Sequence, residues 1–246
     1  DVTAGDRSKV YGAADPTLGY TVDAADLKYA DTAAVVSGVS LNTATGAAAT
    51  AGTHVIAASG GTASNYDIVL HDGTLTVAKA QLAVTANDAN KVYGAADPTL
   101  GYSVDASGLK YADTAAVVSG VSLATATGAA ATAGTHVITA GGGSASNYEL
   151  QYVDGTLTVA KAQLEVTAND ANKVYGAADP TLGYTVDAAD LKYADTAAVV
   201  SGVSLNTATG AAATAGTHVI AASGGTASNY DIVLHDGTLT VAKAQL

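Results

Sequence analysis

The sequence contains no cysteine, methionine, tryptophan or phenylalanine, and only 3 of its 246 residues are proline. Without cysteine the chain can form no disulfide, no thiolate metal site and no thiol nucleophile, whichever compartment it occupies. Without the larger apolar side chains, a core must be built from Val, Leu, Ile, Ala and the 13 tyrosines. We therefore expect a light core in which any buried tyrosine hydroxyl needs a hydrogen-bond partner.

Basic residues are also scarce. The chain has 10 Lys and Arg against 22 Asp and Glu, which gives a formal net charge of -12. This balance disfavours nucleic acid and anionic membrane surfaces as partners, because both attract clustered Lys and Arg. No apolar run of about 18 residues occurs, and no basic start leads into an apolar stretch, so we expect neither membrane insertion nor a signal peptide.

What the sequence has in abundance is repetition. Two segments recur with a period of 82 residues: KVYGAADPTLGY begins at Lys9, Lys91 and Lys173, and AKAQL ends at Leu82, Leu164 and Leu246. This period is far longer than that of a solenoid unit and suits a small independent domain. We therefore predict three tandem domains, called here repeat 1 (1–82), repeat 2 (83–164) and repeat 3 (165–246).

The copies are nearly the same. Residues 9–82 and 173–246 are identical over 74 positions, and repeat 2 differs from them at 12. Recent duplication explains this identity, which also favours domain swapping during folding; the high net charge counteracts that tendency.

Within one repeat, short runs rich in β-branched and aromatic residues alternate with Gly, Asp, Asn and Pro. The runs predicted as strands are residues 81–86, 17–23, 39–43, 53–58, 66–71 and 74–80. Their number and spacing predict an all-β fold of small sandwich-like domains, Ig-like or β-grasp-like, arranged end to end as an elongated rod.

Turn chemistry refines this prediction. Asp72-Gly73 stands between two alternating runs and predicts a tight hairpin, because Asp-Gly supplies the positive φ values that such a turn needs. Asp15-Pro16 marks a turn before a strand, and ADTAAVVSG predicts one helical turn with Asp31 as its N-cap and Gly38 at its end.

The differences in repeat 2 test which strand face is buried. At the inward positions of the run NYDIVLH, the residues Tyr66, Ile68 and Leu70 become Tyr148, Leu150 and Tyr152 and stay apolar or aromatic, whereas Asp67, Val69 and His71 become Glu149, Gln151 and Val153. The first set is therefore predicted to face the core and the second set to face water.

The stretch LTVAKAQLAVTAND predicts how one repeat meets the next. Its apolar residues are odd-numbered at Leu75 and Val77 but even-numbered at Leu82, Val84 and Ala86. With a period of two, the buried face must switch between Val77 and Leu82. The stretch is thus the last strand of one repeat joined through AKAQ to the first strand of the next, without a flexible linker, and we predict restricted bending.

No set of residues indicates catalysis. His54 lies in an apolar strand, where a packing role is expected, and His71 has Val153 as its counterpart in repeat 2. No HExxH spacing occurs, and no nucleophile stands with an oriented base. We therefore expect no enzyme activity and no catalytic or cofactor-binding residue.

Calcium is the one metal alternative. The segment NDAN supplies oxygen ligands near a repeat boundary, at Asn87, Asp88 and Asn90 and again at Asn169, Asp170 and Asn172. Its spacing does not match a calcium loop, and the first copy reads GDRSK, with Arg7 among the potential ligands. A solvated polar turn is the preferred interpretation, so no cofactor and no metal site are predicted.

Two further motifs are assigned to connections and packing. The glycine run at residues 58–64 and the segment NTATGAAATAG are predicted to be loops, because they lack a phosphate-binding lysine and are punctuated by glycine. A Lys-Asn isopeptide bond would need Lys9, Lys28 or Lys79 beside Asn65 in the core. The strand phase does not clearly bury any lysine, so this bond is not expected.

The order KVYGAADPTLGYTV, YADTAAVVSG, AGTHVI and SNYDIVLHDGTLTVAKA resembles the MBG domain, a mostly β, glycine-rich repeat, in the variant marked by a Tyr-Gly pair. Tyr11-Gly12, Tyr93-Gly94 and Tyr175-Gly176 stand at that pair, and the resemblance covers all three repeats. His54 departs from the pattern, since such domains commonly have Tyr there. The resemblance implies no catalytic residues and an extracellular setting in large secreted or surface proteins of bacteria, often adhesins.

These observations lead to two hypotheses of function. The first is a structural stalk of a bacterial cell-surface or secreted adhesin, which projects a distal adhesive region and supports cell adhesion or biofilm formation. The alternative is a multivalent module with one weak glycan- or matrix-binding site per repeat. The expected partners are neighbouring repeats of a longer parent chain, with matrix polysaccharide or a host or cell surface as further candidates, and the chain itself is expected to be a monomer.

Overall fold

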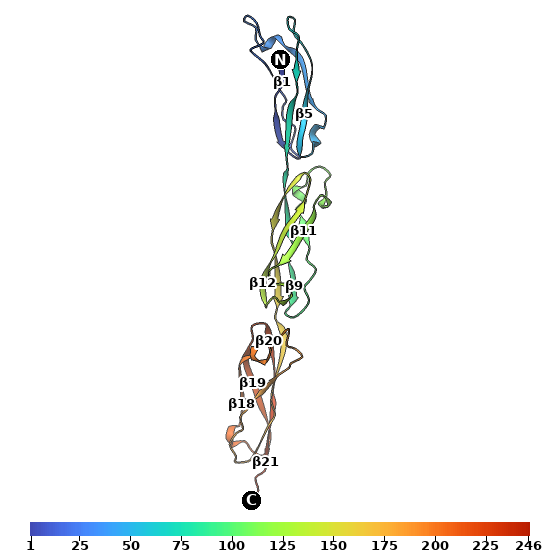
Figure 1. Ribbon diagram of the computed structural model, residues 1–246. Coiled ribbons are helices and arrows are strands. Elements are labelled where there is room, and N and C mark those ends of the chain that lie inside the picture. The colour runs from blue at the N-terminus through green and yellow to red at the C-terminus, as the bar shows by residue number, and fades with distance from the viewer. The chain divides into compact units, whose positions relative to one another are not determined.

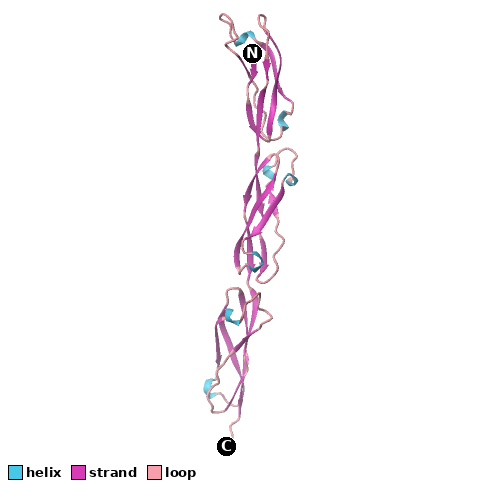
Figure 2. Cartoon of the chain, in the orientation of Figure 1, coloured by secondary structure: helices cyan, strands magenta, loops and turns pink.

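The computed structural model describes all residues from 1 to 246. The chain consists almost entirely of β structure, with 21 strands, and its only helices are seven 3-10 turns of three residues each (Figure 2). None of these turns is long or apolar enough to cross a membrane. The all-β fold class predicted from the sequence is confirmed.

The chain forms two compact units. Unit 1 comprises Asp1–Ala86, Gly101–Leu123 and Thr139–Asp154, and unit 2 comprises Asn87–Leu100, Ala124–Ile138 and Gly155–Leu246. Repeat 2 is thus divided between the units, so the domain boundaries at residues 82 and 164 and the end-to-end arrangement stay predictions.

Repeat 1 contains seven strands and two 3-10 turns (Figure 1). They are β1 (Val2–Ala4), β2 (Arg7–Val10), β3 (Tyr20–Val22), η1 (Ala33–Val35), β4 (Ser37–Thr43), η2 (Gly46–Ala48), β5 (Gly52–Thr62), β6 (Leu70–His71) and β7 (Gly73–Ala78).

The other repeats follow the same order with longer strands at the position of β6. Repeat 2 has β8 (Ala80–Ala86), β9 (Ala89–Val92), β10 (Tyr102–Val104), η3 (Ala106–Gly108), η4 (Ala115–Val117), β11 (Ser119–Thr125), η5 (Gly128–Ala130), β12 (Gly134–Ser144), β13 (Tyr148–Val153) and β14 (Gly155–Ala160). Repeat 3 has β15 (Ala162–Ala168), β16 (Ala171–Val174), β17 (Tyr184–Val186), η6 (Ala197–Val199), β18 (Ser201–Thr207), η7 (Gly210–Ala212), β19 (Gly216–Thr226), β20 (Tyr230–His235) and β21 (Gly237–Ala242).

Repeats 1 and 3 are each built from two small sheets. In repeat 1 a three-stranded sheet has the order β3-β1-β6 and a four-stranded sheet the order β2-β7-β5-β4. In repeat 3 the corresponding orders are β17-β15-β20 and β16-β21-β19-β18. Within unit 1, β8 of repeat 2 pairs with β10 and β13, and within unit 2, β14 pairs with β9 and the first half of β12.

Each sheet mixes parallel and antiparallel neighbours, because each of the first two strands of a repeat pairs in parallel with a late one. In repeat 1, β1 is parallel to β6 and β2 is parallel to β7, whereas β5 is antiparallel to β4 and β7. The inward residues of the two sheets meet in a thin core in which Ala4, Ile56, Leu75 and Val77 are 0–3% exposed. This is the sandwich-like packing expected from the alternation.

The strand phases are as predicted. Tyr148, Leu150 and Tyr152 of β13 alternate inward with the exposed Glu149 and Val153. At the start of repeat 2, Val77 is buried, Ala78 and Lys79 are exposed, and Ala80 and Leu82 are buried, with β7 ending at Ala78 and β8 beginning at Ala80. The predicted switch of the buried face therefore occurs at Lys79, without a linker.

The hairpin predicted at Asp72-Gly73 is wrong. β6 and β7 lie in different sheets, so the dipeptide carries the chain from one sheet to the other. Gly73 is required here by close approach, since a Cβ on it would lie 2.6 Å from the carbonyl oxygen of Ala4, and it does not adopt a positive φ. Asp72 accepts a hydrogen bond from the backbone N–H of Ala58 (2.9 Å) and so ties the crossing to β5.

Four strand predictions also need correction. The strand predicted at residues 66–71 is only Leu70–His71 in repeat 1, although its counterparts in repeats 2 and 3 have the full length. The strand predicted at residues 17–23 is only Tyr20–Val22, and the predicted glycine loop continues β5 to Thr62. Gly60 and Gly61 adopt φ of 69° and 91°, and a Cβ on Gly60 would lie 2.9 Å from the carbonyl oxygen of Gly38, so glycine lets this strand stay paired with β4. The strand Arg7–Val10, β2, which ends in the first two residues of KVYG, was not predicted because its lysine interrupts the apolar pattern.

The helical turn in ADTAAVVSG is present as η1, but its cap differs. Thr32, and not Asp31, is the N-cap, and its hydroxyl accepts from the N–H of Ala34 (3.4 Å). Asp31 instead accepts a hydrogen bond from the hydroxyl of Tyr66 (2.7 Å). Gly38 lies beyond the turn, inside β4.

Candidate functional site

The histidines form local contacts. His54, His136 and His218 each place Nε2 2.7 Å from the carbonyl oxygen of the residue four positions earlier, to which the ring N–H donates. His71 lies 3.3 Å from Asp1, and His235 lies 3.5 Å from Glu165. In repeat 2 these two positions are Ala83 and Val153, so the acid and the histidine are lost together. This pairing indicates a surface contact between neighbouring strands.

The acidic residues of NDAN have structural contacts inside their repeats. Asp88 accepts a hydrogen bond from the backbone N–H of Thr156, and Asp170 one from that of Thr238, both at 2.8 Å. Asn169 accepts from the hydroxyl of Thr185 (2.6 Å). No group of three or more His, Asp or Glu side chains is placed so that it could hold a metal ion. The calcium alternative stays a prediction.

Lys9 is buried, contrary to the expectation that no lysine is. Only 3% of its side chain is exposed, because it points inward from β2 while its neighbour Val10 points outward. Its ammonium group donates to Asp15 (2.6 Å) and to the carbonyl oxygens of Ala47 (2.6 Å) and Ala13 (3.4 Å). The buried charge is therefore paired, as a buried charge must be, and it holds the KVYGAADP loop against η2. Lys91 and Lys173 repeat this arrangement.

The loop held by Lys9 presents Tyr11 to the next repeat. The Tyr11 ring is 5% exposed and stands edge-on to Tyr111 and Tyr148 of repeat 2, with ring centroids 5.4 Å away in each case. Edge-to-face pairs at this distance are the favourable arrangement for aromatic rings. One tyrosine of repeat 1 is thus enclosed by two tyrosines of repeat 2.

A carboxylate joins the hydroxyl groups of this cluster. Asp113 Oδ2 accepts from Tyr11 (3.0 Å) and from Tyr148 (2.6 Å), and the Tyr148 hydroxyl in turn accepts from the backbone N–H of Lys110 (2.8 Å). Tyr111 donates to the carbonyl oxygen of Ala47 in repeat 1. Hydrogen bonds to a charged acceptor are stronger than those between neutral groups, so the network favours one arrangement of the two repeats.

Backbone groups add to the same contact. Asn147 accepts from the N–H of Ala51 through its side chain and from the N–H of Ala80 through its carbonyl, both at 3.0 Å. Lys79, at the switch between β7 and β8, donates to the carbonyl oxygen of Ala145 (2.9 Å). We call this set the first junction; its side chains are those of Tyr11, Lys79, Tyr111, Asp113, Asn147 and Tyr148.

Two backbone conformations shape the first junction. Gly12 has a φ of 85°, and a Cβ on it would lie 2.6 Å from Cδ of Lys110. Tyr111 has a φ of 55°, in the left-handed region that costs a non-glycine residue about 1–2 kcal/mol. Tyr29 and Tyr193, its counterparts in repeats 1 and 3, have φ of 57° and 55°. The strained conformation is thus a feature of each repeat.

The second junction, between repeats 2 and 3, has the same contacts. Asp195 accepts from Tyr93 (3.1 Å) and Tyr230 (2.6 Å), and Asn229 accepts from the N–H of Ala133 (3.0 Å). Tyr93 stands 5.4 Å from Tyr193 and from Tyr230. The chain therefore builds one contact twice from repeated residues.

Burial changes the acidity of these phenols. Burial, and then the hydrogen bond to Asp113, raises the pKa of Tyr148 to about 12. The same causes, with Asp195 as the acceptor, raise the pKa of Tyr230 to about 12. Burial also raises the pKa of Tyr11. All three phenols therefore stay protonated near neutral pH and can donate to their carboxylates.

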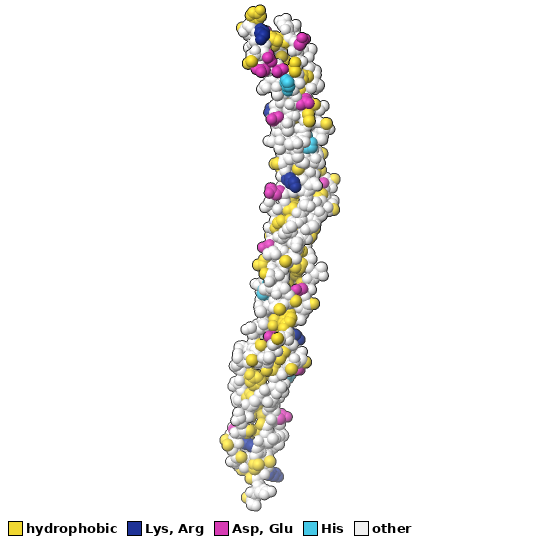
Figure 3. Space-filling view, in the orientation of Figure 1, with side chains coloured by type: hydrophobic (Ala, Val, Ile, Leu, Met, Phe, Trp, Pro, Cys, Tyr) yellow, Lys and Arg dark blue, Asp and Glu magenta, His cyan; other side chains and the backbone are white.

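Sequence reasoning found the Tyr-Gly pair as a family mark but missed its role at the junction. One signal was available: none of the 12 positions at which repeat 2 differs falls within KVYG, KYAD or SNY, the segments that supply Tyr11, Asp113 and Tyr148. The cluster has no nucleophile beside a base, so its chemistry is that of packing and hydrogen bonding. On the face seen in Figure 3, charged side chains are scattered among hydrophobic and other side chains and form no large cluster.

Comparison with known families agrees with this architecture. The family model described as MBG domain (YGX type) matches residues 1–76, 82–158 and 164–240. No curated protein matches the chain.

Proposed function

The chain belongs to the MBG domain family of the YGX type, and we propose that it is a stalk segment of a bacterial cell-surface or secreted adhesin. MBG repeats are a structural, non-enzymatic type that is typically found in large surface or secreted proteins. The proposal adds that the segment lies outside the cell, projects a distal adhesive region and supports cell adhesion or biofilm formation. In this proposal the role of the segment is mechanical, because it supplies length, stiffness and resistance to proteolysis.

The observation that carries the proposal is the junction without a linker. One residue, Lys79, separates the last strand of repeat 1 from the first strand of repeat 2. Beside it, Tyr11 is enclosed by Tyr111 and Tyr148 and bonded to Asp113. Bending at Lys79 would separate these rings and leave hydroxyl groups unpaired, so each junction resists bending. A stalk needs this property, whereas a flexible tether does not.

Distance measurements test the stiffness directly. The chain has no cysteine, so Ser40→Cys and Ser122→Cys place two spin labels without background, at exposed and equivalent positions of repeats 1 and 2. We expect a single narrow distance distribution. Insertion of four glycines after Lys79 should broaden it, while insertion of four glycines after Ala25, in the exposed loop between β3 and η1, should leave it unchanged. A broad distribution in the unmodified chain would contradict the proposal.

Small-angle scattering tests the length. Three repeats with strands of six to nine residues, placed end to end, should give a maximum dimension of roughly 100 Å at about 3.3 Å per residue plus loops. Side-by-side packing of such repeats would give a compact particle with a maximum dimension of roughly 60 Å. A measured dimension of that size would exclude a stalk.

A further inference from the structure

Tyrosine is the most easily oxidised side chain of this protein. Cysteine, methionine and tryptophan, which oxidants commonly attack first, are all absent, whereas 13 tyrosines are present. A one-electron oxidant that meets the folded chain therefore takes its electrons from tyrosine. The product then depends on which tyrosines lie close together and on where their protons can go.

The close tyrosine pairs lie at the two junctions, and in each junction two of the hydroxyl groups converge. At the first junction the ring centroids of Tyr11 and Tyr148 are 5.4 Å apart. Both hydroxyl groups donate to the same oxygen, Oδ2 of Asp113, at 3.0 and 2.6 Å. The ring carbons next to the two hydroxyls are therefore brought toward each other. These ortho carbons are the positions at which phenoxyl radicals couple.

Asp113 supplies the base that oxidation of a phenol needs. Loss of an electron makes a phenol strongly acidic, so the electron leaves more easily where the proton can pass at once to a hydrogen-bonded acceptor. The carboxylate of Asp113 accepts from both Tyr11 and Tyr148 and carries the charge that strengthens such bonds. Burial raises the pKa of both phenols, so near neutral pH they are oxidised through this proton transfer and not as phenolates.

Tyr111 connects the buried pair to solvent. Its side chain is 55% exposed, whereas Tyr11 and Tyr148 are 5% and 1% exposed. The hydroxyl of Tyr111 donates to the carbonyl oxygen of Ala47, which is too weak a base to take its proton. Oxidation of Tyr111 is therefore passed on to Tyr11, whose ring centroid is 5.4 Å away. The radical on Tyr11 is shielded from solvent and from other chains, so a second oxidation finds it in place.

We propose that the first junction is a site of oxidative cross-linking, at which a haem peroxidase and hydrogen peroxide join Tyr11 to Tyr148 as dityrosine. Each phenol loses one electron and its hydroxyl proton, and the two radicals form a carbon–carbon bond between their ortho carbons. The hydrogens of these two carbons then move to the oxygens and restore both hydroxyl groups. One hydrogen peroxide takes up the two electrons and two protons and becomes two water molecules.

The second junction repeats the site. Tyr93 and Tyr230 have ring centroids 5.4 Å apart and donate to Asp195, at 3.1 and 2.6 Å. Tyr193, which is 54% exposed, stands 5.4 Å from Tyr93 in the place of Tyr111. Without an oxidant the groups of both junctions only pack and donate hydrogen bonds. With one, each cross-link adds a covalent connection between neighbouring repeats, which at the first junction are otherwise joined only through Lys79.

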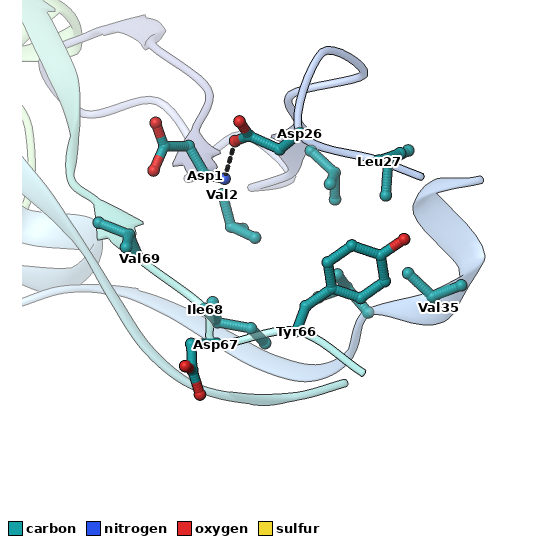
Figure 4. A pocket seen from close by; sticks show the side chains of 11 residues that line it. Asp1, Val2, Asp26, Leu27, Val35, Tyr66, Asp67, Ile68 and Val69 are labelled. Atoms are coloured by element: carbon teal, nitrogen blue, oxygen red, sulfur yellow. Dashed lines mark hydrogen bonds and ion pairs between the residues drawn. The ribbon is translucent and has the colours of Figure 1, made fainter. Parts of the chain in front are cut away.

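Tyr66 is a comparison within the same chain. Its hydroxyl donates to Asp31 (2.7 Å), and its ring lines a cavity together with Val35 and Ile68 (Figure 4). This tyrosine has a carboxylate acceptor but belongs to none of the close ring pairs, which all lie at the junctions. We therefore expect no dityrosine at Tyr66.

Treatment of the full chain with a haem peroxidase and hydrogen peroxide tests this inference. Dityrosine fluorescence should appear, and tryptic digestion should yield two cross-linked products, each lighter by two hydrogens than the sum of its two peptides. The first product joins residues 10–28 to 111–161, and the second joins residues 92–110 to 193–243. In urea, the same treatment should spread the cross-links over other tyrosines and between chains.

Variants assign the products to the named side chains. Tyr11→Phe should abolish the first product and leave the second, and Tyr93→Phe should do the reverse, because Phe keeps the ring in place but forms no phenoxyl radical. Asp113→Asn keeps the shape of the side chain without its basicity, and it should lower the yield of the first product severalfold relative to the second. Tyr20→Phe, in the same tryptic peptide as Tyr11, is the matched control and should change neither product.

Three results would overturn the inference. The first is a folded chain that forms no dityrosine. The second is a first product that persists in Tyr11→Phe or keeps its full yield in Asp113→Asn. The third is dityrosine found only between chains, with a yield that rises with protein concentration. In each variant, the product of the untouched junction shows that the rest of the chain is folded.

Discussion

The tyrosine of the Tyr-Gly pair allows a matched test of the coupling between repeats. Tyr11 and Tyr175 lie in stretches that are identical over 74 residues, so their surroundings within the repeat are the same. They differ in their neighbours, because repeat 2 covers Tyr11 to 5% exposure while Tyr175 remains 53% exposed. Tyr11→Ala therefore removes a contact between repeats that Tyr175→Ala does not.

The structure gives the expected size of the difference. The next repeat covers about half of the tyrosine side chain, and half of a side chain that buries about 200 Å² is worth about 2 kcal/mol. The hydrogen bond to Asp113 adds about 1.5 kcal/mol, and each edge-on ring pair adds about 0.5 kcal/mol. Tyr11→Ala should thus destabilise the folded chain by about 3–5 kcal/mol more than Tyr175→Ala.

Urea unfolding followed by tyrosine fluorescence measures this difference. Tyr175→Ala should leave the unfolding curve close to that of the parent chain. Tyr11→Ala should shift its transition to lower urea and separate repeat 1 from the rest of the transition. If the two variants gave superimposable curves, the tyrosine would act only within its own repeat and the junction would contribute no coupling.

Three further predictions concern the backbone, the phenols and the buried lysines. In urea unfolding, Gly12→Ala should lower the free energy of unfolding by about 1–2 kcal/mol more than Gly176→Ala. Both residues have a positive φ, but only a Cβ at residue 12 would crowd Lys110 of the next repeat. The pKa of Tyr148 is raised to about 12, so the protonated phenol contributes about 2–3 kcal/mol to the free energy of unfolding. This contribution is fully present below pH 10 and is lost as the pH rises to about 12. Urea midpoints and tyrosinate absorbance measured across this pH range check the prediction. Asp97→Ala should lower the free energy of unfolding by about 2 kcal/mol, because it leaves the buried ammonium of Lys91 without its carboxylate. In a double-mutant cycle, adding Lys91→Met should restore most of the stability that Asp97→Ala removes.

The sequence predicted those features of the fold that depend on alternation. Burial at Tyr148, Leu150 and Tyr152 follows directly from a period of two, as does the switch at Lys79. The hairpin at Asp72-Gly73 failed because a turn motif describes only its own residues. Whether the flanking strands pair with each other or with distant partners depends on the long-range pairing of β1 with β6 and of β5 with β7, on which a local motif carries no information.

The candidate site was harder to predict, since its residues contradict simple patterns. Lys9 points inward and Val10 outward, which reverses the usual assignment of charged and apolar residues. The reversal is stable because Asp15 and two carbonyl oxygens surround the ammonium group, and these partners come from a loop and from η2. Tyr11 likewise finds its ring and carboxylate partners in repeat 2, so the sequence of a single repeat cannot explain why it is there.

The tyrosine of the Tyr-Gly pair is buried wherever a neighbouring repeat covers it. Tyr11 and Tyr93 are 5% and 6% exposed under the tyrosines of repeats 2 and 3, whereas the uncovered Tyr175 is 53% exposed. Each covered repeat gains the apolar burial and the hydrogen bond to a carboxylate that the junction supplies, so the junctions couple the stability of neighbouring repeats, as in other nearest-neighbour systems. The coupling is therefore built from residues that every repeat carries.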